Sequence, residues 1–158
     1  MKFICDVMLG KLTKYLRIVG MDTSYSGSLT LSQIISAAAA DQRTILTRRT
    51  DHVLSEQPAA CYFIQSNYPF EQLQDVIRHF NLKADSEQFF TRCLLCNQPL
   101  DAVGKDSVAA SVPAYVLSTA NEFARCPRCS KIYWKGTHYG NMLNRLEKVL
   151  GAVKEGTG

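Results

Sequence analysis

The sequence lacks any long run of apolar residues. Its longest stretch without a charged residue, residues 23–40, still contains eight Ser, Thr or Gln side chains. A segment that polar does not insert as a membrane helix. Residues 1–6 also lack the apolar core and the small-residue cleavage site of a secretory signal. We therefore expect no membrane partner and a cytoplasmic protein.

Extremes of composition and of net charge are also missing. The 158 residues are 46% hydrophobic and 20% charged, which excludes disordered, collagen-like and heptad-rod chains and allows one ordinary domain or two small ones. The net charge is only +4, but it is unevenly placed. Residues 1–89 hold nine basic and nine acidic side chains, whereas residues 90–158 hold nine basic and five acidic. This excess in the C-terminal part weakly favours an anionic partner.

Four of the six cysteines form two C-x-x-C pairs, which are the strongest motif in the chain. Cys93 and Cys96 form the first pair, Cys126 and Cys129 the second, and 29 residues separate the pairs. Such doubled spacing is typical of a structural Zn²⁺ site with four thiolate ligands. The alternative, disulfides in a secreted protein, is disfavoured by the missing signal. Two further cysteines, at positions 5 and 61, lie in apolar runs and are expected to be buried.

Strands and helices are expected to alternate through the first half of the chain. Short apolar runs predict strands near residues 2–6, 23–25, 44–47 and 61–64. Apolar residues at helical spacing predict helices over residues 9–19, around 31–38 and from Pro69 to Phe80, with Gly20 ending the first. This alternation predicts an α/β domain with a parallel sheet flanked by helices. A last helix is expected over residues 140–149, followed by a frayed tail.

Two acidic side chains follow predicted strands. Asp6 follows the first, and Asp51 lies just beyond the strand that ends at Thr47. The carboxyl ends of parallel strands meet at one edge, so these acids could converge there and hold Mg²⁺ or Mn²⁺. The alternative is one helix-capping and one surface carboxylate, which two acids alone do not exclude.

Basic side chains lie near these acids and around the cysteines. The first group suits an RNA backbone, although a solvated helix face explains it as well. It comprises Lys11, Lys14, Arg17, Arg48 and Arg49. The second group mixes charge with aromatic rings, as single-stranded RNA sites do, although its aromatics could instead pack a small zinc core. It comprises Lys131, Trp134, Lys135 and His138.

The chain resembles the RNase family named after the C-terminal domain of Mut-seven. The opening FICDVMLGKL, the knuckle RCLLCN and the run YWKGTHY carry the resemblance, which covers roughly residues 2–143. The family implies a PIN-like nuclease domain followed by a zinc ribbon, and hence a metal-dependent ribonuclease. Asp6 matches a family position and is implied as a metal ligand. Asp22 also matches one, and we interpret it as structural.

The sequence departs from the family where acids are expected. The family places an acid directly after the Thr-Arg pair of its third strand, but here Arg49 follows Arg48 and the next acid is Asp51. The region around Thr30 also lacks the acid that the family carries near its second helix. A PIN-type site needs several carboxylates to hold its metals, so this chain has an incomplete set.

These observations lead to one expectation and two alternatives. We expect a PIN-like α/β domain over residues 1–85, a zinc ribbon with a C-terminal helix over 90–150, and a flexible tail over 151–158. The function is expected to be that of a metal-dependent ribonuclease, with Asp6 and Asp51 as site residues. The alternatives are a catalytically impaired module that binds RNA, the ribosome or another RNA–protein assembly, and a protein-interaction adaptor that uses the ribbon.

Overall fold

The computed structural model describes residues 1–50 and 60–155. The chain divides into two compact units, Met1–Asn97 and Gln98–Gly158. The first unit therefore contains the first cysteine pair as well as the α/β elements. The predicted domain boundary near residues 85–90 stays a prediction.

A four-stranded parallel sheet forms the centre of the first unit, as the alternating pattern predicts. Its strands are β1 (Lys2–Cys5), β2 (Asp22–Tyr25), β3 (Thr44–Thr47) and β4 (Cys61–Phe63). They are arranged in the order β2-β1-β3-β4, and each neighbouring pair is parallel. The chain moves from β1 to one side for β2 and to the other for β3. Such a reversal creates a crevice at the carboxyl edge of the sheet, where ligands bind in open α/β folds.

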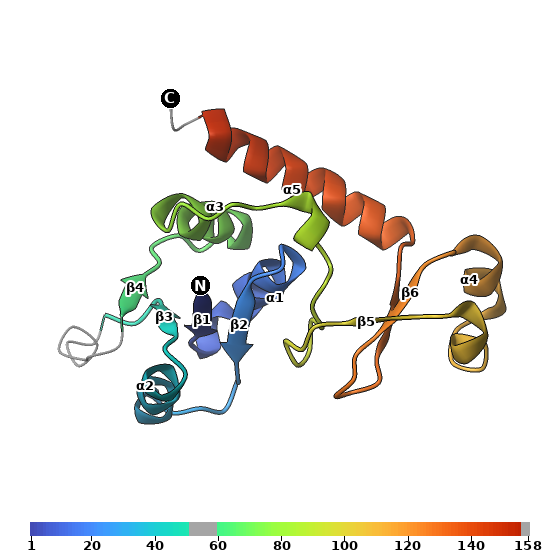
Figure 1. Cartoon of the computed structure of the whole chain (residues 1–158). Coiled ribbons are helices and arrows are strands. Elements are labelled where there is room, and N and C mark those ends of the chain that lie inside the picture. Colours follow the sequence, from blue (N-terminus) through green and yellow to red (C-terminus); the bar gives the residue numbers. More distant parts are fainter. Residues whose placement is uncertain (51–59, 156–158) are drawn as a thin grey trace. The chain divides into compact units, whose positions relative to one another are not determined.

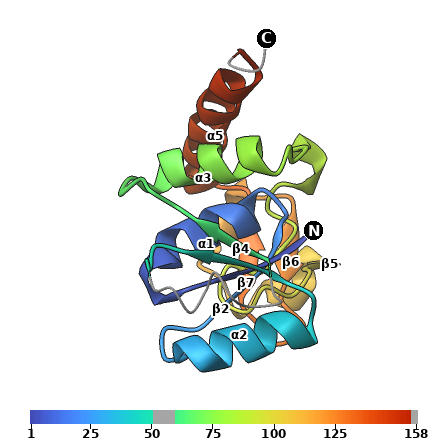
Figure 2. The same cartoon turned by 90° about the vertical axis from the view of Figure 1, so that its left-hand side faces the viewer.

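Three helices cover the two faces of this sheet (Figures 1 and 2). α2 (Leu31–Ala40) lies on one face, and α1 (Gly10–Ile18) and α3 (Pro69–His79) lie on the other. Local sequence sets their starts. Thr30 forms a capping box with Gln33 at the start of α2, and Pro69 occupies the first turn of α3, where its missing N–H is not needed. A 3-10 turn, η1 (Val7–Leu9), connects β1 to α1.

Alternating strand residues build a core on each face. Ile4 of β1 and Ile45 of β3 pack against Ile34 and Ala38 of α2. On the other face, the Phe3 ring meets the Phe80 ring edge-on, with ring centroids 5.3 Å apart. Fully buried leucines complete this second layer, namely Leu12, Leu16 and Leu73. The sheet is thus covered on both faces, which explains why its inner strands read as continuous apolar runs.

Two cysteines outside the C-x-x-C pairs have different environments. Cys5 is buried in central strand β1, as predicted, and burial raises the pKa of its thiol to about 12. The prediction that Cys61 is buried is wrong, because this residue is exposed. It lies in β4, which is the last strand in the sheet order and is paired on one side alone. An edge position leaves an apolar residue open to solvent, which strand pattern alone cannot reveal.

Gly20 ends the first helical segment because the backbone turns there with φ of +86°. A side chain at this position would also place its Cβ 2.6 Å from the carbonyl oxygen of Gln88. Glycine alone satisfies both the left-handed conformation and this close approach. The segment after α3 is thus packed against the end of α1, and it contains the 3-10 turn η3 (Ser86–Gln88).

The second unit contains a small antiparallel sheet. Its strands are β5 (Asp101–Val103), β6 (Phe123–Arg125) and β7 (Ile132–Trp134), in that order. The turn η4 (Lys105–Val108) and helix α4 (Ala114–Thr119) join β5 to β6. Buried Val108, Val116, Ala120 and Phe123 form the core of this unit.

The C-terminal helix is longer than the sequence pattern predicts. α5 spans Thr137–Glu155, whereas apolar spacing predicts residues 140–149. The sequence-based bounds stop at Gly140 and Gly151, but the helix continues through both, because a glycine lowers helix propensity without ending a helix. None of the helices in the described part of the chain has the length and apolar character needed to cross a bilayer.

Candidate functional site

Asp6 lies at the carboxyl end of β1 and is completely buried. Its Oδ1 accepts a hydrogen bond from the Met8 amide at 2.8 Å, which caps η1. Its Oδ2 accepts hydrogen bonds from the Thr47 hydroxyl and, at 3.1 Å, from the Arg48 amide. The predicted convergence of Asp6 with the end of the third strand is confirmed for Thr47 and Arg48. Through these hydrogen bonds, Asp6 links the carboxyl end of β1 to that of β3.

The other residues of the predicted acidic site are placed as follows. Asp51 lies outside the described residues. Arg49 follows β3, and its amide donates to the Thr47 hydroxyl at 2.9 Å. A group of at least three His, Cys, Asp or Glu side chains whose ligand atoms lie close together could hold a metal ion. Within residues 1–50 and 60–155, the four paired cysteines form the only such group. The described side chains alone therefore do not form a carboxylate site for Mg²⁺ or Mn²⁺, and the roles of Asp6 and Asp51 stay predictions.

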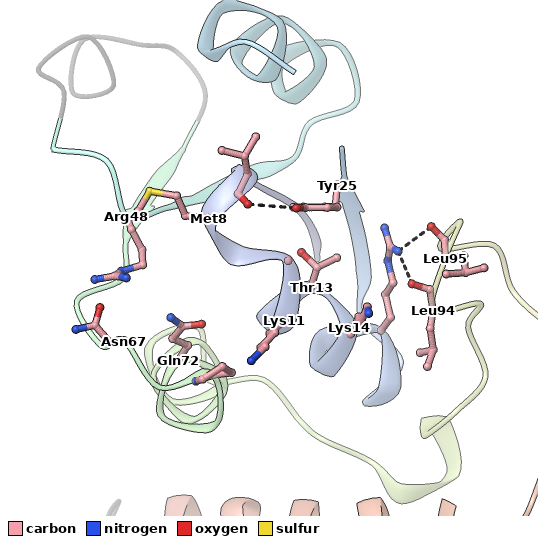
Figure 3. A pocket seen from close by; sticks show the side chains of 14 residues that line it. Met8, Lys11, Thr13, Lys14, Tyr25, Arg48, Asn67, Gln72, Leu94 and Leu95 are labelled. Carbon is pink, nitrogen blue, oxygen red and sulfur yellow. Dashed lines mark hydrogen bonds between the residues drawn. The ribbon is translucent and has the colours of Figure 1, made fainter. Parts of the chain in front are cut away.

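A cavity of about 630 Å³ opens beside this edge of the first unit (Figure 3). Its wall combines residues that follow β1, β3 and β4 with the exposed side of α1. Four of the predicted RNA-binding side chains line it, namely Lys11, Lys14, Arg17 and Arg48. None of the described residues that line it is acidic. The volume lies within the range of roughly 300 to 1,000 Å³ that is usual for ligand pockets.

Three polar side chains that line the cavity, buried Thr13 and Gln72 and half-buried Tyr25, donate hydrogen bonds to the protein's own main chain. The Thr13 hydroxyl donates to the Leu9 carbonyl at 3.0 Å, and the Gln72 amide donates to the Ser66 carbonyl at 2.9 Å. The Tyr25 hydroxyl donates to the Val7 carbonyl at 3.2 Å. Gly10 permits this last contact, because a Cβ there would lie 3.0 Å from the Tyr25 oxygen. These bonds give the cavity a fixed shape.

The rim of the cavity carries positive charge without a matching negative one. Lys11 and Lys14 are exposed, and neither they nor Arg48 forms an ion pair with any described residue. The Arg48 Nε atom is buried and has no hydrogen-bond acceptor among the described residues. In Figure 3, Arg48 and Asn67 lie on one side of the cavity, and Lys11 extends toward them from α1. This arrangement favours an anionic ligand.

Arg17 differs from the other basic residues of the cavity because its guanidinium is already bonded to the main chain. It is 4% exposed, and its Nε donates to the Thr23 carbonyl at 2.9 Å. Its Nη1 donates to the carbonyls of Leu94 and Leu95 at 2.8 and 3.0 Å. Burial lowers the pKa of Arg17 from its ordinary value, and the nearby cysteines partly offset that effect. These contacts give Arg17 a structural role, while its contact with RNA stays a prediction.

A second set of contacts holds the first cysteine knuckle against the α/β elements. Asp22 accepts hydrogen bonds from Arg43 at 2.6 Å and from the Asn97 side chain at 2.7 Å. The Asn97 side-chain oxygen accepts from the Thr23 amide at 3.0 Å. Arg92 donates to the Gly20 and Asn97 carbonyls. Asp22 is therefore a structural residue, in agreement with our interpretation of the sequence.

The four paired cysteines form a site that suits Zn²⁺. All four sulfur atoms lie within 4.8 Å of one another, and those of Cys93 and Cys96 are 3.4 Å apart. A tetrahedral zinc with bonds of about 2.3 Å would separate its sulfur ligands by about 3.8 Å. A disulfide would need about 2.05 Å, so the described geometry fits a metal site and not a bridge. Zinc bound there would contribute folding energy to the surrounding loops.

The basic and aromatic residues of the second unit lie in different surroundings. Lys131 and Trp134 line a cavity of about 540 Å³ together with Arg125. Trp134 is 38% exposed, so its ring is not fully used in packing. Lys135 instead pairs with Glu122 at 2.5 Å, and this hydrogen bond raises the Lys135 pKa. His138 is exposed in the first turn of α5. Thus Lys131 and Trp134 come together, whereas Lys135 has an acidic partner.

Sequence reasoning missed several residues of the first cavity. Asn67 follows β4 and lines the cavity, so the rule that ligands gather at strand ends could have identified it. Gln72 and Tyr25 reach the cavity from α3 and β2, and no local signal marks them. Leu94 and Leu95 contribute through the first knuckle, whose position depends on hydrogen bonds to residues more than 70 positions away.

The fold and these sites define a class of protein, which has a parallel α/β unit, a small antiparallel sheet and a group of four cysteines that could form a zinc ribbon. The chain belongs to the Mut7-C RNAse domain family, whose model matches residues 1–146. This assignment confirms the resemblance carried by the opening segment and the first knuckle, and it relates the chain to nuclease-like, RNA-directed proteins. No curated protein and no solved structure matches the chain.

Proposed function

We propose that this protein binds single-stranded RNA through the cavity at the carboxyl edge of its parallel sheet. The observation that carries the proposal is the rim of Lys11, Lys14 and Arg48, which has no acidic residue among its described neighbours in the wall. Phosphodiester groups are the ligand that such a rim fits best in a member of an RNase-domain family. Trp134, with Lys131 and Arg125 beside it, supplies a further contact by stacking on a base.

A metal-dependent ribonuclease is the second candidate, and family membership favours it. In this hypothesis Asp6 and Asp51 hold Mg²⁺ or Mn²⁺, and Arg48 and Arg49 contact phosphate. The complete burial of Asp6 and its three hydrogen bonds favour the binding function instead. Binding within the ribosome or another RNA–protein assembly is a further form of the same proposal.

Salt dependence of binding tests the first candidate. Binding of a single-stranded RNA should weaken as salt rises, because each phosphate contact releases counterions. The double variant Lys11→Ala/Lys14→Ala should lower the slope of log K against log salt by about 1.4, at about 0.7 per lost contact. Lys83→Ala is the matched control, because Lys83 is exposed and lies outside the cavity wall. An unchanged slope in the double variant would contradict binding at this cavity.

A cleavage assay separates the two candidates. A mixed RNA pool is incubated with Mn²⁺ and with wild type, Asp6→Asn or Arg49→Asp. If the protein is a nuclease, Asp6→Asn should abolish cleavage and Arg49→Asp should raise it, because an acid replaces a cation beside the metal. Retained folding of each variant is checked by circular dichroism. If wild type leaves the RNA uncleaved but binds it in a salt-dependent way, the result supports the binding function and contradicts the nuclease hypothesis.

A further inference from the structure

We propose that the cavity beside β1 and β3 recognises the terminal phosphate of an RNA strand, and not only the phosphates within it. This inference rests on the proposed RNA binding and specifies which part of the strand enters the cavity. The ligand class is a phosphate monoester at a strand end, 5′ or 3′. Three features of the first unit support it.

The first feature is the balance of charge. A phosphodiester carries one negative charge, whereas a terminal monoester carries about −1.5 to −2 near neutral pH. Lys11, Lys14 and Arg48 bring three positive charges to one cavity, and none has an ionic partner among the described residues. A single diester would leave most of that charge unmatched. A dianionic end with the adjoining diester matches it more closely.

The second feature is the type of hydrogen-bonding group that is still available. The hydroxyls of Thr13 and Tyr25, which line the cavity, already donate to backbone carbonyls. Arg48 retains a buried Nε–H without an acceptor in the described structure. The Lys11 ammonium adds further N–H donors, and Asn67 also lines the cavity (Figure 3). A monoester has three terminal oxygens that accept from such donors, one more than a diester offers.

The third feature is the wall of the cavity. Thr13, Arg17 and Gln72 are each at most 4% exposed, so this part of the wall is packed into the protein. The start of α1 at Gly10 and Lys11 also lies in the wall, and its first turn contains no acidic residue. A helix start adds partial positive charge near an anion. A dianionic chain end gains more from this partial positive charge than a singly charged phosphodiester does.

Competition binding tests this inference. A labelled 12-nucleotide RNA is displaced by unlabelled strands of the same sequence that carry a 5′-phosphate, a 3′-phosphate or hydroxyl groups at both ends. The buffer contains no added Mg²⁺ or Mn²⁺. We expect at least one phosphorylated strand to compete about tenfold better than the hydroxyl strand, as one additional charge-assisted hydrogen bond would give. A gain at one end supports the proposal and identifies the end, and an equal gain at both ends also supports it.

Variants of exposed residues connect the gain to the cavity. Lys11→Ala should lower the affinity for the phosphorylated strand to the affinity for the hydroxyl strand. Asn67→Asp, which keeps the side-chain shape but adds negative charge, should do the same. Lys83→Ala removes an equal charge outside the cavity and should preserve the gain. Persistence of the tenfold gain in both Lys11→Ala and Asn67→Asp would overturn the assignment to this cavity.

The failures of the two proposals are distinguishable. Equal competition by phosphorylated and hydroxyl strands against wild type would overturn end recognition and leave RNA binding intact. Failure of the labelled strand to bind at all would overturn the proposed function itself, and end recognition with it.

Discussion

Asp6 is the residue whose surroundings differ most from those of a typical metal ligand. Its two carboxylate oxygens accept three hydrogen bonds, from Met8, Thr47 and Arg48, and the side chain is fully buried. An amide in its place offers a single acceptor oxygen and turns an N–H₂ group toward backbone donors. The carboxylate is therefore important for stability whether or not it also holds a metal.

We predict that Asp6→Asn lowers the free energy of unfolding by about 2 to 4 kcal/mol, because buried donors lose their acceptor. Urea denaturation measures the change. Asp85→Asn is the matched control, since Asp85 caps the turn η3 from an exposed position and accepts from the Glu87 amide. Asparagine caps about as well as aspartate there, so the control should change by less than about 0.5 kcal/mol. Equal changes in the two variants would contradict this account of Asp6.

Asp22 gives the molecule a defined response to acid. Burial opposes its ionisation, but hydrogen bonds from Arg43 and Asn97 outweigh burial and lower its pKa below the ordinary value of 3.8. A lowered pKa means that the folded state binds protons less readily than the unfolded state. The stabilisation from Asp22 is therefore complete above the unfolded pKa and is lost as the pH falls through the folded pKa.

We predict that the stability difference between wild type and Asp22→Asn is constant from pH 5 to pH 8 and shrinks below about pH 4, where the carboxyl of the unfolded chain becomes protonated. Urea denaturation of both proteins at each pH measures it. Protonation of other groups affects both proteins and cancels in the difference. A stability difference that grows as the pH falls would contradict a lowered pKa of Asp22 in the folded state.

At the scale of elements, α1 connects the α/β unit to the first cysteine knuckle. Arg17 on this helix donates to Thr23 in β2 and to Leu94 and Leu95 between Cys93 and Cys96. The planar guanidinium reaches three carbonyls at once, which the single ammonium of lysine cannot do. Helix α1 therefore sets the conformation of the loop that presents two of the metal ligands.

We predict that Arg17→Lys accelerates the transfer of zinc to a chelating dye about tenfold, as loss of a charge-assisted hydrogen bond of about 1.4 kcal/mol would do. Arg78→Lys, at an exposed position in the last turn of α3, is the control and should not change the rate. Metal analysis of both proteins should first show one zinc per chain. Identical release rates would show that Arg17 does not support the knuckle.

For the whole molecule, the sequence predicts features that depend on neighbouring residues. It does not predict contacts between residues that are far apart in the chain. The strands β1 and β3 follow from local apolar runs, and helix α2 follows from apolar residues at helical spacing. The cysteine group follows from spacing alone. The burial of Asp6 and the attachment of Arg17 to Leu94 could not be predicted, because they depend on partners 41 and 77 positions away.

The cationic side chains illustrate the same point. Of the five basic residues that the sequence places together, Lys11, Lys14, Arg17 and Arg48 line one cavity, since strand ends and the following helix share that edge of the sheet. Arg49 is not among the residues that line it, and the RNA-binding role of the group stays a prediction. Their individual states were not predictable. Arg17 is bonded to carbonyls and Lys135 to Glu122, whereas Lys11 has no ionic partner among the described residues. The sequence shows where charged side chains are concentrated. Whether each one is available to a ligand depends on its neighbours in the folded structure.

The central place of β1 lets the four parallel strands assemble in the order of their synthesis. β1 leaves the ribosome first, β2 then joins one of its edges, β3 joins the other, and β4 joins β3. Every strand adds to an open edge, and none has to insert between two strands that are already paired. The growing chain can thus bury Ile4 and Phe3 step by step during translation, before the last ligands of the cysteine group have been made.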